Sequence, residues 1–178
     1  MSTKKYTIHY LWDGTSCLPS ERVDISIEEH QKRLLINIDA PFHHDPPPPV
    51  PPQSLWGLWE YEVVEVFLVG SDGQYLEAEF SPHGHHLLLW LSSPRQVTHK
   101  HLPVDFEVTH TQNRWKGRAY IDLDQIPNPV QRCNFFAIHG LDKHRRYLCY
   151  SPLNTVKPDF HQPDRFPLFE HDPESPCT

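Results

Sequence analysis

The chain has 178 residues, of which 16 are Lys or Arg and 23 are Asp or Glu, so its formal net charge is -7. This charge argues against nucleic acid and against an anionic membrane surface as partners. No stretch approaches the roughly 20 apolar residues that span a bilayer, and the first residues lack an apolar signal core. We therefore expect a cytoplasmic protein with one domain over residues 1–178.

The composition also predicts short strands and free thiols. The 19 prolines favour short strands joined by stiff loops over long helices. Four cysteines show no CxxC spacing and are expected to be reduced: Cys17, Cys133, Cys149 and Cys177. The basic run Lys143–Arg146 is expected to be a solvated turn.

Alternation of apolar and polar residues predicts strands along most of the chain. In chain order they cover residues 6–12, 22–27, 33–39, 59–69, 74–81, 85–91, 96–101, 104–110, 114–122, 133–140 and 145–151. Residues 41–54 predict a stiff proline-rich loop, and residues 157–178 predict an irregular C-terminal tail. Because several strands are apolar on both faces and no ordinary helix is predicted, we expect an antiparallel β-sandwich rather than a barrel.

The predicted strand over residues 59–69 carries Glu65 in an otherwise apolar row. If Gly70–Gly73 form a four-residue loop, Glu65 faces Ala78 on the next strand. The opposite face then holds three other glutamates: Glu62, Glu77 and Glu79. A loop longer or shorter by one residue would reverse this matching.

The common catalytic motifs GxSxG, HExxH and the Gly-rich phosphate loop do not occur in the chain. Sugar recognition needs a flat aromatic surface and fixed hydrogen-bonding groups, and Trp59 and Glu65 can supply one of each. Alternatively, Glu65 is a buried carboxylate satisfied by backbone amides, Tyr61 or a histidine. The other three glutamates form either a charged solvent face or a calcium site.

Two further functions are open at this point. Histidines near strand ends, His83, His139 and His161, have the ligand chemistry of a metal site. With Glu65 they suggest a cytoplasmic enzyme that acts on a sugar or related metabolite, with or without a metal. The loop at 41–54 is alternatively a segment that binds a protein partner. We favour binding of a small saccharide or similar polar ligand over catalysis.

Several segments resemble the family 9 carbohydrate-binding modules and the related DOMON-like sandwiches. They are WEYEVVEVFL at 59–68, YLEAEFSPHG at 75–84, NFFAIH at 134–139, YSP at 150–152 and PDFH at 158–161. Over nearly its full length, the chain is closer still to a small uncharacterised family whose vertebrate member is known only as an open reading frame.

The resemblance to the modules implies a jelly-roll-like sandwich that holds a sugar between two aromatic side chains, with structural calcium in some members. Trp59 and Glu65 match one stacking aromatic and one sugar-binding carboxylate. The second aromatic position falls at Tyr150, and an arginine position falls at His139. The expected ligand-binding set is therefore Trp59, Glu65, His83, His139, Tyr150 and His161.

Overall fold

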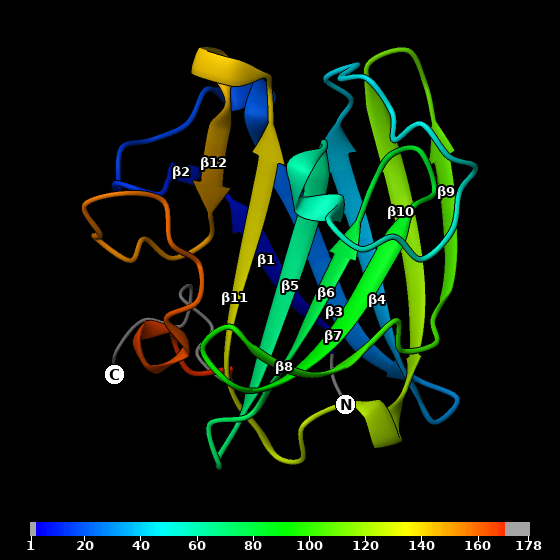
Figure 1. Ribbon diagram of the computed structural model, residues 1–178, viewed down its shortest axis with the longest axis vertical. Coiled ribbons are helices and arrows are strands. Elements are labelled where there is room, and N and C mark those ends of the chain that lie inside the picture. Colours follow the sequence, from blue (N-terminus) through cyan, green and yellow to red (C-terminus); the bar gives the residue numbers. More distant parts are fainter. Residues whose placement is uncertain (1–2, 170–178) are drawn as a thin grey trace.

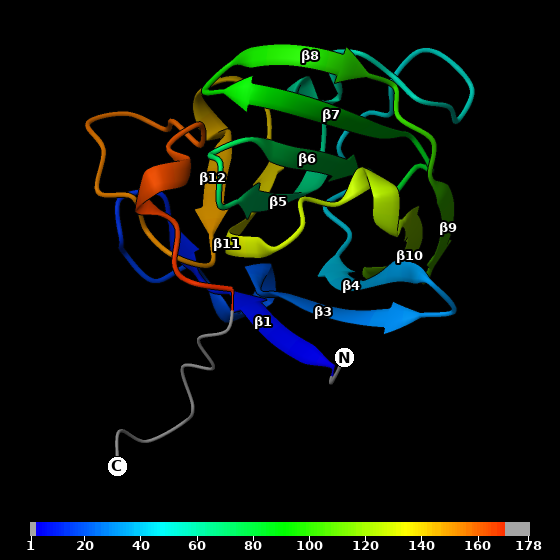
Figure 2. The same cartoon turned by 90° about the horizontal axis from the view of Figure 1, so that it is seen from below.

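The computed structural model describes residues 3–169, which form two antiparallel sheets packed face to face (Figure 1). The five-stranded sheet has the order β1-β3-β4-β10-β9. Its strands are β1 (Lys4–Ile8), β3 (Val23–His30), β4 (Arg33–Pro41), β9 (Asp105–His110) and β10 (Arg114–Asp122). Figure 2 shows this sheet as a separate layer beneath the second one.

The second sheet has seven strands in the order β2-β12-β11-β5-β6-β7-β8, with β5 at its centre. Its strands are β2 (Tyr10–Leu11), β5 (Val63–Gly70), β6 (Tyr75–Phe80), β7 (His86–Ser93), β8 (Gln96–Lys100), β11 (Val130–His139) and β12 (Arg146–Cys149). Short 3-10 turns lie between or after the strands of the two sheets: η1 (Pro19–Glu21), η2 (Leu58–Glu60), η3 (Leu123–Gln125), η4 (Asp142–His144) and η5 (Pro163–Arg165). The predicted all-β antiparallel sandwich is confirmed.

Alternate side chains of both sheets fill the space between them. In β10, Trp115, Gly117, Ala119 and Ile121 are buried while the residues between them are more exposed. This is the predicted pattern of a strand with one face in water. In β5, by contrast, every residue is buried, so both faces of the seven-stranded sheet must be covered there.

A second apolar cluster covers the outer face of the seven-stranded sheet. Phe67 of β5, Leu89 of β7 and Phe136 of β11 pack there with Leu58 of η2 and Phe166 after η5. The η2 turn and the segment around η5 therefore fold over the outer face of this sheet. This explains why the central strands are apolar on both sides.

Two predicted strands differ most from those in the structure. The predicted strand at 6–12 divides at His9, and its halves join different sheets as β1 and β2. The predicted strand at 59–69 begins only at Val63, because Gly57 has a φ of 86° and starts the η2 turn that carries Trp59. The first difference depends on which strands pair and the second on a local turn, and alternation of residues reveals neither.

The remaining predictions concern loops and thiols. Residues 42–53 contain neither strand nor helix. Cys17, Cys133 and Cys149 are free thiols. Cys177 and the part of the predicted tail beyond residue 169 lie outside the described residues. None of the helices within residues 3–169 is long and apolar enough to cross a membrane.

Candidate functional site

A cavity of about 410 Å³ lies on the outer face of the seven-stranded sheet. Volumes of roughly 300–1,000 Å³ are typical of small-molecule sites. Side chains of β5, β6 and β7 form its floor. Its walls come from the η2 region, the β7–β8 turn, the start of β12 and residues 158–161.

Three glutamates meet at the floor of this cavity. Glu65 of β5 pairs directly with Glu79 of β6, and Glu77 is two positions from Glu79 on the same face. One carboxylate oxygen from each glutamate lies within 4.8 Å of those from the other two. Glu65 and Glu77 line the cavity itself. The hairpin thus concentrates three acidic groups at one point.

This arrangement corrects the predicted register of the hairpin. The Gly70 N–H donates to the Gln74 carbonyl at 2.8 Å, so the loop between them has three residues rather than four. Gly73, with a φ of 80°, provides the left-handed residue that three-residue loops use. Glu65 therefore faces Glu79, one position from the predicted partner.

The three carboxyl groups are removed from water. Glu65 is 2% exposed, Glu77 4% and Glu79 0%. Burial raises the pKa of Glu65 to about 8. Burial, with repulsion from the neighbouring carboxylates, raises the pKa of Glu77 and of Glu79 well above the ordinary value.

Several oxygens of this cluster are unsatisfied. Glu77 Oε2 and both carboxylate oxygens of Glu79 are buried without a hydrogen-bond partner among residues 3–169. A buried polar atom without a partner costs roughly 1–3 kcal/mol. The floor of the cavity therefore favours a ligand that brings hydrogen-bond donors or positive charge.

Aromatic side chains form part of the walls. Trp59 packs edge-to-face on Trp56, with ring centroids 5.0 Å apart and planes at 84°. Phe160 stacks on Phe136 at 3.9 Å and lines the cavity together with Tyr147. The cavity thus offers flat apolar surface next to a strongly polar floor.

Two arginines that sequence reasoning missed also line the cavity. The guanidinium of Arg145 donates to the backbone carbonyls of Trp59 and Glu60, so it fixes the η2 turn. Arg95 forms an ion pair with Asp159 at 2.6 Å. Arg145 belongs to the basic run Lys143–Arg146, for which the sequence predicts a solvated turn. Its role in fixing the η2 turn was not predictable, because the carbonyls that it contacts are distant in the sequence.

His161 also lines the cavity and is held by a residue of β6. Its Nδ1 lies 2.8 Å from the Tyr75 hydroxyl, and its backbone N–H donates to the Asp159 carboxylate. Burial lowers the pKa of His161 to about 4. The imidazole is therefore neutral near pH 7, and one of its ring nitrogens is hydrogen-bonded to the Tyr75 hydroxyl.

Of the predicted ligand-binding set, the structure brings Trp59, Glu65 and His161 together at this cavity. His139 lies elsewhere, because alternation along β11 directs Ile138 to the outer face and His139 to the inner one. Its Nε2 lies 3.0 Å from Glu21 Oε1, and its ring stacks on His43 with centroids 3.6 Å apart.

Tyr150 and His83 also lie away from the cavity. Tyr150 packs between the sheets, with its ring edge-on to Tyr6 at 5.3 Å. Tyr147, three residues earlier, is the tyrosine of this segment that lines the cavity. His83 Nε2 is bonded to the Asp45 carbonyl at 3.2 Å. The three predicted histidines therefore contact different partners.

The predicted calcium candidates are divided in the same way. Glu62 precedes β5 and accepts hydrogen bonds from the backbone N–H groups of His43 and Asp45. Burial raises its pKa to about 7. Glu65, rather than Glu62, lies beside Glu77 and Glu79 in the acidic cluster. No other cluster of His, Cys, Asp or Glu residues that could hold a metal ion occurs in residues 3–169.

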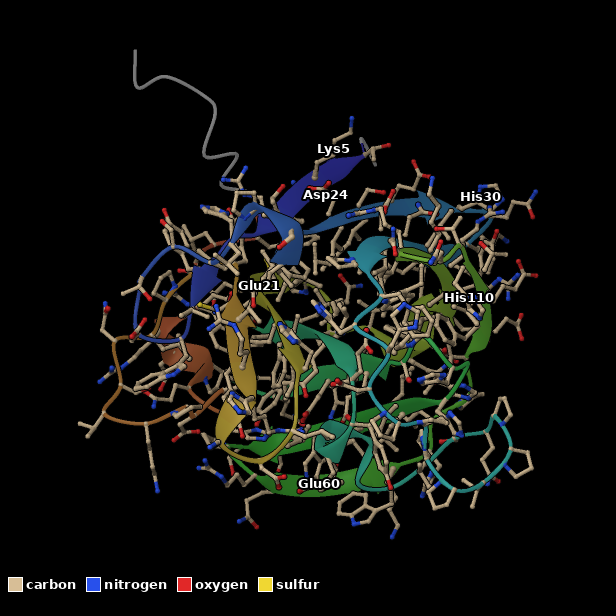
Figure 3. The ribbon with its side chains drawn as sticks, turned by 90° about the horizontal axis from the view of Figure 1, so that it is seen from above. Lys5, Glu21, Asp24, His30, Glu60 and His110 are labelled. Carbon is tan, nitrogen blue, oxygen red and sulfur yellow. The ribbon has the colours of Figure 1, made fainter. Side chains whose placement is uncertain are left out.

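A shallow groove of about 730 Å³ crosses the outer face of the five-stranded sheet. Its lining includes Lys5, Asp24, Asp39 and Lys116, and Asp39 already pairs with Lys116 at 3.6 Å. Figure 3 shows Lys5 and Asp24 on the side of the molecule opposite Glu60, which lies at the cavity. The charged side chains of this groove are exposed and partly paired with one another. We therefore regard the cavity, rather than the groove, as the candidate site.

Fold and cavity define the class: a β-sandwich protein with a ligand-sized pocket on the outer face of one sheet. The fold is similar to the crystal structure of a putative carbohydrate-binding protein from Bacteroides uniformis, with a TM-score of 0.72 and 14% identity. The match covers 92% of this chain and 84% of that one. At this identity the likeness shows the fold alone.

No family model matches the chain. Human UPF0462 protein C4orf33 is 37% identical over 173 residues, which covers 92% of this chain and 86% of the human one. Its homologues from Rattus norvegicus and Danio rerio are 38% and 34% identical, with 86% and 87% of their lengths covered and 92% of this chain in each case. The chain therefore belongs to the UPF0462 family. The finer resemblance to family 9 modules and DOMON-like sandwiches stays a prediction.

Proposed function

We propose that the cavity binds a small saccharide or a similar polyhydroxylated molecule. The observation that carries this proposal is that Trp59 and Glu65, from different elements, line one cavity. A sugar ring has an apolar face of C–H groups and a rim of hydroxyls. Trp59 offers a flat surface for the face, and the Glu65 carboxyl group offers hydrogen bonds to the hydroxyls.

Other side chains of the cavity support the same ligand class. The side chain of Arg95 is 58% exposed. Its guanidinium can therefore donate hydrogen bonds to ligand hydroxyls while it is paired with Asp159. The cavity volume lies within the range of small-molecule sites. Further support comes from the Bacteroides uniformis protein, which shares the fold and is described as putatively carbohydrate-binding.

Tryptophan fluorescence titration with soluble mono- and disaccharides tests the proposal. At least one sugar should produce a saturable change in the wild-type protein. Trp59→Ala should abolish that change without altering the far-UV circular dichroism. The matched control is Trp90→Phe, because Trp90 lies in the same sheet but packs against the core between the sheets. The proposal fails if neither soluble sugars nor a glycan array shows binding to the wild-type protein.

A further inference from the structure

The acidic cluster has an electrostatic imbalance that the protein does not correct by itself. Three neighbouring carboxyl groups cannot all ionise in a buried site without a compensating positive charge. Arg145 lies close enough to favour ionisation of Glu65, but its guanidinium donates to the carbonyls of Trp59 and Glu60. No ion pair joins any of the three glutamates to a basic residue within residues 3–169.

The position of Glu79 points to a missing partner. Its side chain is fully buried, and neither of its carboxylate oxygens has a hydrogen-bond partner among the described residues. One of those oxygens lies within 4.8 Å of oxygens from Glu65 and Glu77. A buried, unsatisfied carboxylate aimed at two others is an arrangement that a shared cation would stabilise.

The donor set suits a hard cation such as calcium, because all three ligands are carboxylate oxygens. Oxygens bind Ca²⁺ at about 2.3–2.6 Å, so two ligands of one ion lie at most about 5 Å apart. The three oxygens lie within 4.8 Å of one another, so one calcium ion can reach all three. The open cavity above Glu65 and Glu77 gives room for the further oxygens that calcium requires.

We propose that Glu65, Glu77 and Glu79 bind a divalent cation of the calcium type at the floor of the cavity. The site is formed by strands β5 and β6 alone, so cation binding does not require a saccharide. Because the carboxyl groups must lose their protons to bind the ion, binding should release protons and should tighten as the pH rises.

Terbium luminescence tests this proposal on the full chain without any sugar. Tb³⁺ is a probe for calcium sites, and Trp59 and Trp56 line the same cavity, where they can sensitise its luminescence. The wild-type protein at about pH 8 should give saturable luminescence on tryptophan excitation, and Ca²⁺ should displace the probe. Glu79→Gln and Glu77→Gln should each weaken Tb³⁺ binding at least about tenfold.

Glu107→Gln is the control for the loss of one negative charge, because Glu107 is exposed on β9 of the other sheet. It should bind Tb³⁺ as the wild type does. Calorimetry with Ca²⁺ in two buffers of different ionisation enthalpy should show proton release. Absence of saturable Tb³⁺ and Ca²⁺ binding in the wild type would overturn the proposal, as would unchanged binding in both glutamate variants. Since no sugar is present, either result leaves the saccharide proposal to its own test.

Discussion

Glu65 and Glu79 are direct cross-strand partners near the centre of the seven-stranded sheet. Like charges in such positions destabilise a sheet, and both side chains are almost fully buried. The hairpin therefore holds an arrangement that stability alone disfavours. Such arrangements of ionisable groups are concentrated at functional sites.

Without divalent cations, the protein should be less stable near pH 8.5 than near pH 6.5. The pKa of Glu65 is raised from 4.5 to about 8. Between pH 4.5 and about pH 8, the folded state therefore binds more protons than the unfolded chain. The free energy of unfolding consequently falls as the pH rises through this range. Histidines such as His161, whose pKa is lowered to about 4, change stability in the opposite direction only below their ordinary pKa of 6.5.

Urea unfolding of the wild type and of Glu79→Gln at both pH values measures this effect. The variant should lose less stability between the two, by on the order of 1–3 kcal/mol, because it removes one buried carboxyl group and relieves the others. Chelator should be present throughout. An identical loss in both proteins would show that the cluster does not titrate in this window.

Arg145→Lys should weaken saccharide binding about tenfold, which corresponds to about 1.4 kcal/mol. A single ammonium cannot reproduce the planar guanidinium that reaches the carbonyls of both Trp59 and Glu60. The η2 turn should loosen, and the near-UV circular dichroism of the tryptophans should decrease. Arg118→Lys, on the other sheet beside Tyr120, is the control. Wild-type affinity in Arg145→Lys would refute a positioning role.

Tyr75→Phe should lower the free energy of unfolding by roughly 1–2 kcal/mol. The change removes the hydroxyl that is hydrogen-bonded to His161 Nδ1 and leaves a partly buried ring nitrogen without this partner. Urea unfolding gives the stability, and NMR titration of His161 reports whether its environment has changed. Tyr120→Phe is the comparison, because Tyr120 is a half-buried residue of the other sheet whose hydroxyl accepts an exposed hydrogen bond from Arg118. Equal stabilities of Tyr75→Phe and the wild type would contradict the assigned bond.

His139→Gln should leave saccharide affinity unchanged while lowering stability by about 1 kcal/mol. His139 lies on the inner side of β11 and contacts Glu21 and His43 rather than the cavity. Arg146 and the backbone N–H of Leu18 also donate hydrogen bonds to Glu21, so the carboxylate keeps two partners in the variant. A loss of sugar affinity comparable to that of Trp59→Ala would return His139 to the binding site.

Strands with one face in water were predictable from the sequence. The bounds predicted for β10 match those observed, because charged and apolar residues alternate along Arg114–Asp122. The division at His9 was not predictable in this way. Both halves alternate, and the change of sheet depends on pairing with β3 on one side and β12 on the other.

The candidate site was predictable only in part, for a similar reason. Alternation identified Glu65 as unusual, but its partner depended on whether the hairpin loop has three or four residues. The resemblance favoured Tyr150, but Tyr147 is the tyrosine that lies on the outer face, and Tyr150 lies on the inner one. A shift by an odd number of residues changes the face on which a side chain lies.

We propose that a saccharide binds with its ring on Trp59 and its hydroxyls at Glu65. A crystal structure of the complex with the tightest-binding sugar from the titrations tests it most directly. We predict a sugar ring in contact with the Trp59 indole and a hydroxyl within hydrogen-bond distance of the Glu65 carboxyl group. A sugar bound in the groove of the five-stranded sheet, or at His139 and Tyr150 without touching Trp59, would contradict the claim.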